Sequence, residues 1–275
     1  MNKLFASEYE LDDNGWIKFP PDASYRKRMF PPEVNQHPAK ANIYLVQSII
    51  EYVSESDELI MDVMAGTGTI MVGALVGRSV ICVEISEKFH KLQVAALNHL
   101  ETIAPGVSGN ISLVNLPCQT YLPIPNLVNH IIFSPQYAGI MKKKVVNDQW
   151  NKDTGYDFVE YSTNPLNLGT MSEFLWAFEM EKVYKKCFDT IKPGGTMTLI
   201  LKDHISAGER IGLTDMGIKS SVKVGFNYSP AEHYKWAAPG MPYTSARRAR
   251  GEPTVDDEDI VVLRKPEVLD ESLVY

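Results

Sequence analysis

The stretch Leu59–Ile70 reads L-I-M-D-V-M-A-G-T-G-T-I, and the rest of the chain is arranged around it. Its first residues, Leu59–Val63, form a short apolar run typical of a buried parallel strand. Gly66 and Gly68 then allow a tight turn that can approach a ligand closely, because glycine has no Cβ atom. The next residues, Thr69–Val76, predict a helix whose N-terminus favours an anionic group. Together these features indicate the ligand-binding crossover of an open α/β sheet.

The residues after this turn exclude two common nucleotide motifs. A dinucleotide fingerprint needs a third glycine at the position of Met71, and a P-loop needs Gly-Lys-Ser or Gly-Lys-Thr where Gly73 is followed by alanine. The next predicted strand, Ser79–Glu84, ends in an acid that can accept hydrogen bonds from both ribose hydroxyls. An adenosyl group without phosphates fits this layout. We therefore favour S-adenosylmethionine over an ordinary glycine turn beside a solvent-exposed Glu84.

Composition indicates a globular chain of one large α/β domain. It has 275 residues, of which 44% are apolar and 22% charged. No apolar run reaches transmembrane length, and Met1–Glu10 lacks a signal-peptide pattern, so we expect no membrane association. Cys82, Cys118 and Cys187 have no metal-binding spacing, which favours the cytoplasm and no metal. The net charge of −7 argues against nonspecific coating of nucleic acid but allows a local basic cleft.

The rest of the chain alternates predicted strands and helices, which implies a mostly parallel sheet covered on both faces. Further strands are predicted at 111–114, 129–133, 196–202, 227–236 and 259–264, and helices at 42–52, 87–100 and 171–190. We expect residues 1–36 to form an irregular arm and residues 37–275 a single domain. We expect insertions at about 138–170 and 237–257 to serve target recognition, and residues 205–225 to form a linker with a short helix.

Four motifs occur in a fixed order, namely H-P-A-K (His37–Lys40), D-V-M-A-G-T-G-T (Asp62–Thr69), V-E (Val83–Glu84) and S-P-Q-Y (Ser134–Tyr137). This order resembles the amino-methyltransferases of DNA, which carry a D/N/S-P-P-Y/F tetrapeptide after the fourth strand. The similarity covers most of the chain and continues through Ile191–Asp203, Val224–Phe226 and Glu258–Lys265. The resemblance implies a Rossmann-like methyltransferase fold with a seven-stranded sheet whose last strand is antiparallel.

The resemblance also implies cofactor contacts at the matching positions. Around the methionine part of S-adenosylmethionine it places Asp62, Met64, Ala65, Gly66, Gly68 and Thr69. The H-P-A-K segment would close over the cofactor with His37, Pro38, Ala39 and Lys40. Glu84 would hold the ribose beside Ile85, and Asn115 and Leu116 would flank the adenine. Asn115 stands where the family more usually has an acid.

The tetrapeptide carries the predicted chemistry. The exocyclic amine of cytosine or adenine is a poor nucleophile, because its lone pair is delocalised into the ring. The Ser134 hydroxyl and the Pro135 carbonyl can each accept a hydrogen bond from one N–H of this amine. These two hydrogen bonds free the lone pair of the nitrogen, and the reaction requires no metal. Tyr137 offers a ring face to an extruded base. Gln136 replaces the second proline of the family, which indicates either tolerated variation or a slowed or inactive enzyme.

Other candidate residues have two interpretations. Pro117–Cys118–Gln119 resembles the nucleophile motif of carbon-5 cytosine methyltransferases, but it follows the third predicted strand instead of the fourth, so we expect Cys118 to be a packing residue. Two basic clusters flank the expected mouth of the site and either position phosphates or form solvated loops. They comprise Lys142, Lys143 and Lys144, and Arg247, Arg248 and Arg250.

The sequence therefore predicts an S-adenosylmethionine-dependent DNA methyltransferase that modifies an exocyclic amine, as in restriction–modification. Serine at the head of the tetrapeptide favours cytosine N4 over adenine N6. An RNA methyltransferase and a catalytically impaired nucleic-acid-binding protein remain the alternatives. The small recognition region is compatible with a homodimer or a partner subunit.

Overall fold

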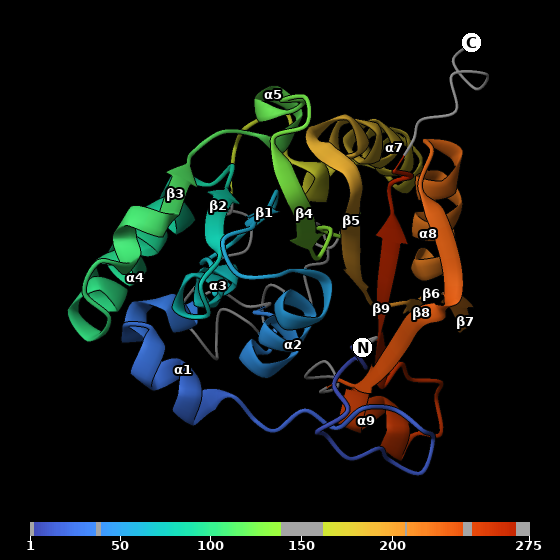
Figure 1. The fold of residues 1–275 in the computed structure, drawn as a ribbon. Coiled ribbons are helices and arrows are strands. Elements are labelled where there is room, and N and C mark those ends of the chain that lie inside the picture. Colours follow the sequence, from blue (N-terminus) through green and yellow to red (C-terminus); the bar gives the residue numbers. More distant parts are fainter. Residues whose placement is uncertain (1–2, 37–39, 139–161, 207, 239–243, 268–275) are drawn as a thin grey trace.

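A seven-stranded sheet runs through the molecule and has helices on both faces (Figure 1). The structure is a computed structural model that describes residues 3–36, 40–138, 162–206, 208–238 and 244–267. The strands are β1 (Leu59–Asp62), β2 (Ser79–Val83), β3 (Ile111–Val114), β4 (Val128–Phe133), β5 (Ile191–Leu201), β8 (Asn227–Ala237) and β9 (Asp257–Arg264). A separate hairpin pairs β6 (His204–Ser206) with β7 (Glu209–Ile211).

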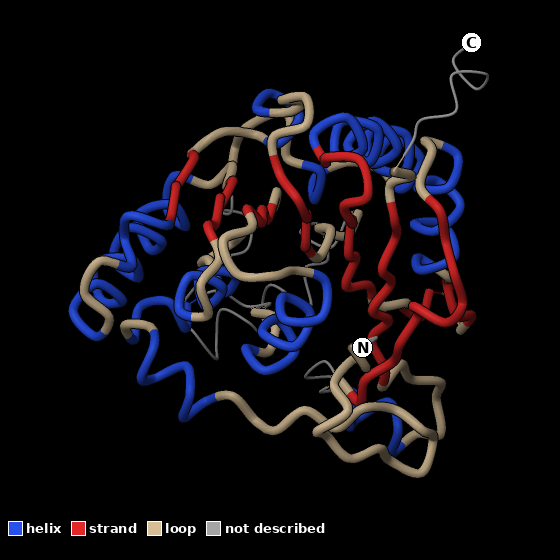
Figure 2. The backbone as a smooth tube through the Cα atoms, viewed as in Figure 1, coloured by secondary structure: helices blue, strands red, loops and turns tan. Residues whose placement is uncertain are grey.

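The helices alternate with the strands along the chain (Figure 2). The α-helices are α1 (Ala23–Met29), α2 (Ile43–Val53), α3 (Val72–Leu75), α4 (Glu87–Ile103), α5 (Cys118–Tyr121), α7 (Glu173–Thr190), α8 (Leu213–Lys223) and α9 (Thr244–Ala249). Short 3-10 helices are η1 (Pro32–Gln36), η2 (Thr69–Met71), η3 (Val107–Asn110) and η6 (Leu168–Thr170). Asn42 caps α2, Ser86 caps α4 and Ser172 caps α7, each through its side-chain oxygen.

The sheet has the order β3-β2-β1-β4-β5-β9-β8. Strands β1 to β5 pair in parallel, whereas β9 is antiparallel to both β5 and β8. The predicted mostly parallel, seven-stranded sheet with an antiparallel last strand is therefore confirmed.

Alternate residues of the strands face two separate cores. On one face Ile60 and its neighbours pack against α2, α3, α4 and the N-terminal segment. On the other face Met61 and its neighbours pack against α5, α7 and α8. Because both faces are covered, the strands read as continuous apolar runs in the sequence.

The predicted helix at 69–76 is confirmed over residues 69–75, where it divides into two helical types. The chain leaves Gly68, which has φ 84, as the 3-10 helix η2 and then makes only the four-residue helix α3. A Cβ at Gly73 would lie 2.7 Å from Ile60 Cδ1. Gly73 therefore lets this short helix pack directly on β1, which is the role of a third glycine in many βα crossovers.

Four predictions need correction. The segment 1–36 is not wholly irregular, since it contains α1 and η1. Strand β5 starts at Ile191, before the start predicted at residue 196. Residues 205–225 hold the β6–β7 hairpin as well as α8, and the basic segment after β8 contains α9. The strand predicted at 227–236 is confirmed as β8, and its pairing with β9 shifts register between Tyr228 and His233, around Pro230.

Gly195 tests the packing of β5 against β4. A Cβ there would lie 2.1 Å from the backbone oxygen of Asn129, so Gly195→Ala must push the two strands apart. We expect a loss of about 1–3 kcal/mol in the free energy of unfolding, measured by urea titration. Gly109→Ala is the matched control, because no atom lies within 4 Å of its Cβ position. Equal stability of the two variants would contradict this packing.

Candidate active site

The carboxyl ends of five parallel strands bring most of the predicted site residues to one edge of the sheet. Asp62 ends β1, while Glu84, Asn115, Ser134 and Lys202 directly follow β2, β3, β4 and β5. The strand order reverses between β1 and β4, which are paired neighbours. Open α/β sheets bind ligands in the crevice at such a point. The glycine turn and the tetrapeptide follow the two strands that flank it.

The glycine turn is fastened to the end of β2. Gly66 has φ 53 and Gly68 has φ 84, a left-handed region that favours glycine. The Gly66 N–H donates to Glu84 Oε2 over 2.7 Å, and the Ala65 N–H donates to the Val83 carbonyl over 2.9 Å. The turn itself is buried, whereas Asp62 and Met64 before it are partly exposed.

Glu84 has a bracing role that sequence reasoning missed. Glu84 is buried, with 1% of its surface exposed, and is not the solvent-exposed acid of an ordinary glycine turn. Its second carboxylate oxygen, Oε1, accepts a hydrogen bond from the Ser86 N–H over 2.7 Å. The carboxylate thus holds both the glycine turn and the N-cap of α4. A carboxylate oxygen can accept more than one hydrogen bond, so this role and the predicted ribose contact are compatible.

Gln93 also stabilises the glycine turn, and the sequence analysis did not identify it. It lies on α4, is 0% exposed, and donates from Nε2 to the Gly66 carbonyl over 2.8 Å. Its Oε1 is buried without a hydrogen-bond partner among the residues that the structure describes. The sequence held a signal, because Gln93 is a polar residue within the apolar stripe formed by Phe89, Ala96 and Leu100.

The predicted adenine side is open. Asn115 donates from Nδ2 to the Glu84 carbonyl over 2.8 Å, which fixes its side chain at the end of β3. Leu116 is 43% exposed and Ile85 is partly exposed. These residues present apolar surface next to a fixed amide at the same sheet edge.

Arg26 is a third residue that the sequence did not single out. It is 4% exposed on α1, where Nη1 donates to Thr69 Oγ1 over 3.3 Å and Nη2 donates to the Ala41 carbonyl over 2.7 Å. Asp22 Oδ2 pairs with it at 2.7 Å. This buried guanidinium links the N-terminal segment to the residue directly after the glycine turn.

Two ionisable groups near the turn have displaced pKa values. Burial raises the pKa of Asp62 to about 7, although the Met64 N–H donates to its Oδ1 over 2.8 Å. Burial, followed by the nearby charge of Arg26, lowers the pKa of Lys40 to about 8. Within the described residues Asp62 has no ion-pair partner. The other residues of the H-P-A-K motif, His37, Pro38 and Ala39, lie outside the described residues.

The tetrapeptide follows β4 and contacts both α7 and β5. Ser134 is exposed and Pro135 is buried. The Gln136 carbonyl accepts the indole N–H of Trp176 over 2.5 Å, a contact from α7 that the sequence did not indicate. The hydroxyl of Tyr137 accepts the backbone N–H of Lys202 over 2.8 Å. Burial raises the pKa of Tyr137 above its usual value, so the phenol stays protonated.

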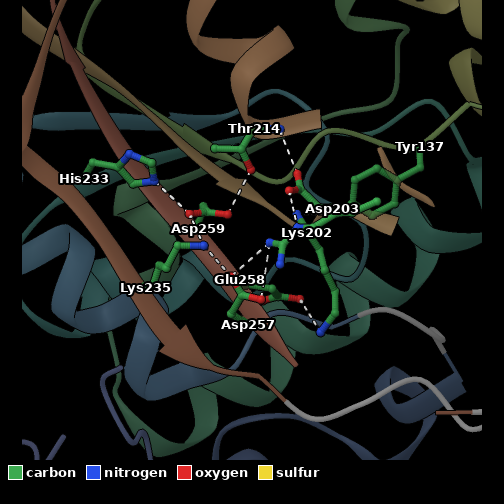
Figure 3. Close-up of polar contacts among 10 residues, drawn as sticks. Tyr137, Lys202, Asp203, Thr214, His233, Lys235, Asp257, Glu258 and Asp259 are labelled. Carbon is green, nitrogen blue, oxygen red and sulfur yellow. Dashed lines mark hydrogen bonds and ion pairs between the residues drawn. The ribbon is translucent and has the colours of Figure 1, made fainter. Parts of the chain in front are cut away.

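A charged network lies beside Tyr137 where β5, β8 and β9 meet (Figure 3). Asp203 accepts the Thr214 N–H over 3.1 Å and pairs with Arg210 at 2.8 Å. Lys202 Nζ lies 4.0 Å from Glu258 Oε1. The other members of the network are His233, Lys235, Asp257 and Asp259. The network fixes the chain directly after β5.

Cys118 is a packing residue, as expected. It is 5% exposed at the start of α5, and burial raises the pKa of its thiol to about 12. Nucleophilic attack needs the thiolate, which is scarce at neutral pH with such a pKa.

The arginines of the second predicted basic cluster pair with acidic neighbours in the same segment. Arg248 pairs with Asp256 at 2.7 Å, and Arg250 pairs with Glu252 at 2.5 Å. Arg247 lies 3.7 Å from the same Glu252. The other predicted cluster, Lys142, Lys143 and Lys144, lies outside the described residues.

The described part of the chain also bears on metals and membranes. No group of three or more His, Cys, Asp or Glu side chains there could hold a metal ion. None of its helices is long and apolar enough to cross a membrane.

Solved structures share this fold at low sequence identity. The (4+2)-cyclase SpnF superposes with a TM-score of 0.52 at 13% identity, over 82% of this chain and 82% of that one. A putative sarcosine dimethylglycine methyltransferase from Galdieria sulphuraria gives 0.51 at 12% identity, over 90% and 99%. A putative transferase from Pyrococcus horikoshii gives 0.48 at 14%, over 82% of this chain and 64% of that one. The predicted Rossmann-like methyltransferase fold is confirmed.

Sequence comparison finds one family match, over the first third of the chain. No curated protein matches the chain. A family model described as DNA methylase matches residues 8–95, which include the glycine turn and Glu84 but end before the tetrapeptide. The resemblance to the DNA methylase family is therefore confirmed over residues 8–95.

Proposed function

We propose that the protein transfers a methyl group from S-adenosylmethionine to an exocyclic amine of a DNA base, with cytosine N4 favoured over adenine N6. One observation carries this proposal. The glycine turn of the matched segment and the S-P-Q-Y tetrapeptide follow β1 and β4, which are paired parallel neighbours at the point where the strand order reverses. A cofactor on the first and a base on the second would meet in the crevice between them.

The charges near the glycine turn fit S-adenosylmethionine. Its sulfonium and ammonium are cationic, and Asp62 is a desolvated carboxylate without a described ion-pair partner. Its carboxylate needs a cation, and Arg26 donates to Thr69 directly after the turn while Lys40 lies close enough to Arg26 to feel its charge. The exposed Leu116 offers an apolar contact for adenine, and Asn115 beside it carries a fixed amide.

The tetrapeptide supplies the chemistry on the side of the base. When bound, S-adenosylmethionine provides an electrophilic methyl group. The Ser134 hydroxyl and the Pro135 carbonyl each accept one N–H of the target amine, which turns its lone pair toward that methyl group. Acceptors held in place before the reaction lower its barrier, because they need no reorganisation in the transition state. The proton that the methylated amine releases passes to water.

The choice of DNA rests on the family of the matched segment. A base in a duplex must leave the stack to reach Ser134 at the sheet edge. The segments 138–170 and 237–257 remain our candidates for target recognition. An RNA substrate would use the same tetrapeptide, so RNA is tested beside DNA in the methyl-transfer experiment below.

The two displaced pKa values predict how the affinity for S-adenosylmethionine depends on pH. Asp62 is ionised above about pH 7, so affinity should fall as pH drops below that value. Lys40 is charged below about pH 8, so affinity should fall as pH rises above it. Each limb should approach about tenfold per pH unit by calorimetry.

Single substitutions separate the two limbs. Asp62→Asn should remove the acid limb alone, and Lys40→Met the alkaline limb alone. The exposed Asp215→Asn is the matched control and should leave both limbs intact. An acid limb that survives in Asp62→Asn would show that Asp62 does not face the cofactor. An alkaline limb that survives in Lys40→Met belongs to the cofactor's own amine.

Transfer of a labelled methyl group tests the function itself. We expect incorporation into DNA, but not into RNA or the protein alone. Ser134→Ala should reduce turnover about 10- to 100-fold while the affinity for the cofactor stays unchanged, because one of two acceptors is lost. Labelling of RNA alone would establish the alternative substrate. Labelling of neither nucleic acid would contradict the proposal.

Gln136 is where the chain departs from the family tetrapeptide. Its carbonyl holds Trp176, and a proline would keep that carbonyl while it removes an N–H donor and restricts φ. We therefore expect Gln136→Pro to raise turnover and to leave the affinity for the cofactor unchanged. A slower Gln136→Pro enzyme with a normal unfolding midpoint would show that the glutamine has a role of its own.

A further inference from the structure

We propose that Gln93 is a positioning residue for the cofactor, which acts with Glu84 on Gly66 and keeps the glycine turn in its ligand-binding form before S-adenosylmethionine arrives. This inference rests on the proposed function. It gives helix α4 a part in cofactor binding that neither the motifs nor the strand ends indicate. Without such a restraint the ligand itself would have to order the turn, at a cost in affinity.

Both backbone polar groups of Gly66 are held by buried side chains from different elements. Its N–H donates to Glu84 Oε2 over 2.7 Å at the end of β2, and its carbonyl accepts a hydrogen bond from Gln93 Nε2 over 2.8 Å on α4. The two peptide planes that flank Gly66 therefore cannot rotate without breaking a hydrogen bond. Gly66 has φ 53 and no side chain of its own to restrict rotation, so these outside contacts set its conformation.

The aliphatic stem of Gln93 supports the other glycine of the turn. A Cβ at Gly68 would lie 3.4 Å from Gln93 Cγ and 2.2 Å from Met71 Cε, so both side chains pack against the Gly68 backbone. The Gly68 N–H donates to the Ala65 carbonyl over 2.7 Å and closes the turn. One side chain thus spans the turn, with its amide at Gly66 and its stem at Gly68.

Stability alone does not account for an amide at this place. Gln93 is 0% exposed, and its neighbours along the buried stripe of α4 are Phe89, Ala96 and Leu100. Its Oε1 has no hydrogen-bond partner among the residues that the structure describes, and burying such an oxygen reduces stability. An apolar side chain would avoid that loss but would leave the Gly66 carbonyl without its donor. These two effects oppose each other, so what the amide adds is a fixed turn.

The turn lies where the charged half of the cofactor would bind. Asp62 precedes it, and Arg26 donates to Thr69 Oγ1 over 3.3 Å directly after it. These charges suit the ammonium and the carboxylate of the amino-acid part, whereas the exposed Leu116 after β3 suits the adenine. A turn that is held less firmly should therefore weaken the binding of the amino-acid part and leave that of the adenosine part largely unchanged.

Gln93→Met tests the proposal on the full chain, because methionine keeps the length of the stem and removes the amide. We expect S-adenosylmethionine and S-adenosylhomocysteine to bind about three- to tenfold more weakly by calorimetry, the effect of one hydrogen bond. Methylthioadenosine, which lacks the amino-acid part, should bind within about twofold of its wild-type affinity. In methyl transfer to DNA, KM for S-adenosylmethionine should rise while kcat stays within about twofold, since the filled site orders the turn.

Hydrogen exchange measures the order of the turn directly. Without cofactor, the Gly68 N–H that closes the turn should exchange about threefold faster, or more, in Gln93→Met than in the wild type. Saturation with S-adenosylhomocysteine should bring the two rates together. Faster exchange in both states would mean that Gln93 only stabilises the fold, and it would overturn the inference.

Asn98→Met is the matched control, because it removes an exposed amide from the same helix. It should leave affinity, exchange and kcat at their wild-type values. Gln93→Asn is a second test variant, which keeps an amide but shortens the stem by one methylene group. It should lose affinity for S-adenosylmethionine as Gln93→Met does, and it tests the inference even if Gln93→Met does not fold.

The possible failures can be told apart. Wild-type affinity in both Gln93 variants overturns the inference and leaves the proposed function standing. An equal loss of affinity for methylthioadenosine also overturns it, because Gln93 would then act on the whole site. A wild-type protein that binds S-adenosylmethionine but methylates no nucleic acid overturns the proposed function alone, whereas one that does not bind the cofactor overturns both.

Discussion

The parallel pairing of β1 with β4 is the constraint on which the site depends. It sets Met61 beside Ile131, so the chain leaves both strands at the same edge of the sheet. One strand continues into the glycine turn and the other into the tetrapeptide that begins with Ser134. Neither motif would make the proposed active site alone, because the proposed reaction requires a cofactor and an amine held in line. The cores on the two faces of the sheet keep these strands in register.

Local sequence predicted the strands well but not the contacts that join them. The buried strands are short apolar runs, and Asp62, Glu84, Asn115 and Ser134 could each be assigned to a strand end. The bracing of Gly66 by Glu84 and Gln93 was not predictable, because it depends on residues 18 and 27 positions apart in the chain. The helix after the turn was predicted in place, but its 3-10 first turn was not, since apolar spacing does not distinguish a 3-10 helix from an α-helix.

The departure at Gln136 has a compensating contact. A proline would stiffen the tetrapeptide through its own ring. Here the indole of Trp176 holds the Gln136 carbonyl, and the backbone of Lys202 holds the Tyr137 hydroxyl one residue later. Hydrogen bonds from α7 and from the end of β5 thus restrain the tetrapeptide, which lacks the conformational restraint of a second proline. Single-sequence reasoning could not weigh this, because both partners lie far along the chain.

The central claim is that the crevice between β1 and β4 methylates an exocyclic amine. Its most direct measurement is mass analysis of nucleosides from DNA treated with the purified protein and S-adenosylmethionine. The account predicts N4-methylcytosine, or N6-methyladenine, and slower formation of that nucleoside with Ser134→Ala but not with Cys118→Ala. The appearance of 5-methylcytosine that disappears with Cys118→Ala would contradict the account, because it would move the chemistry from the tetrapeptide to a thiol.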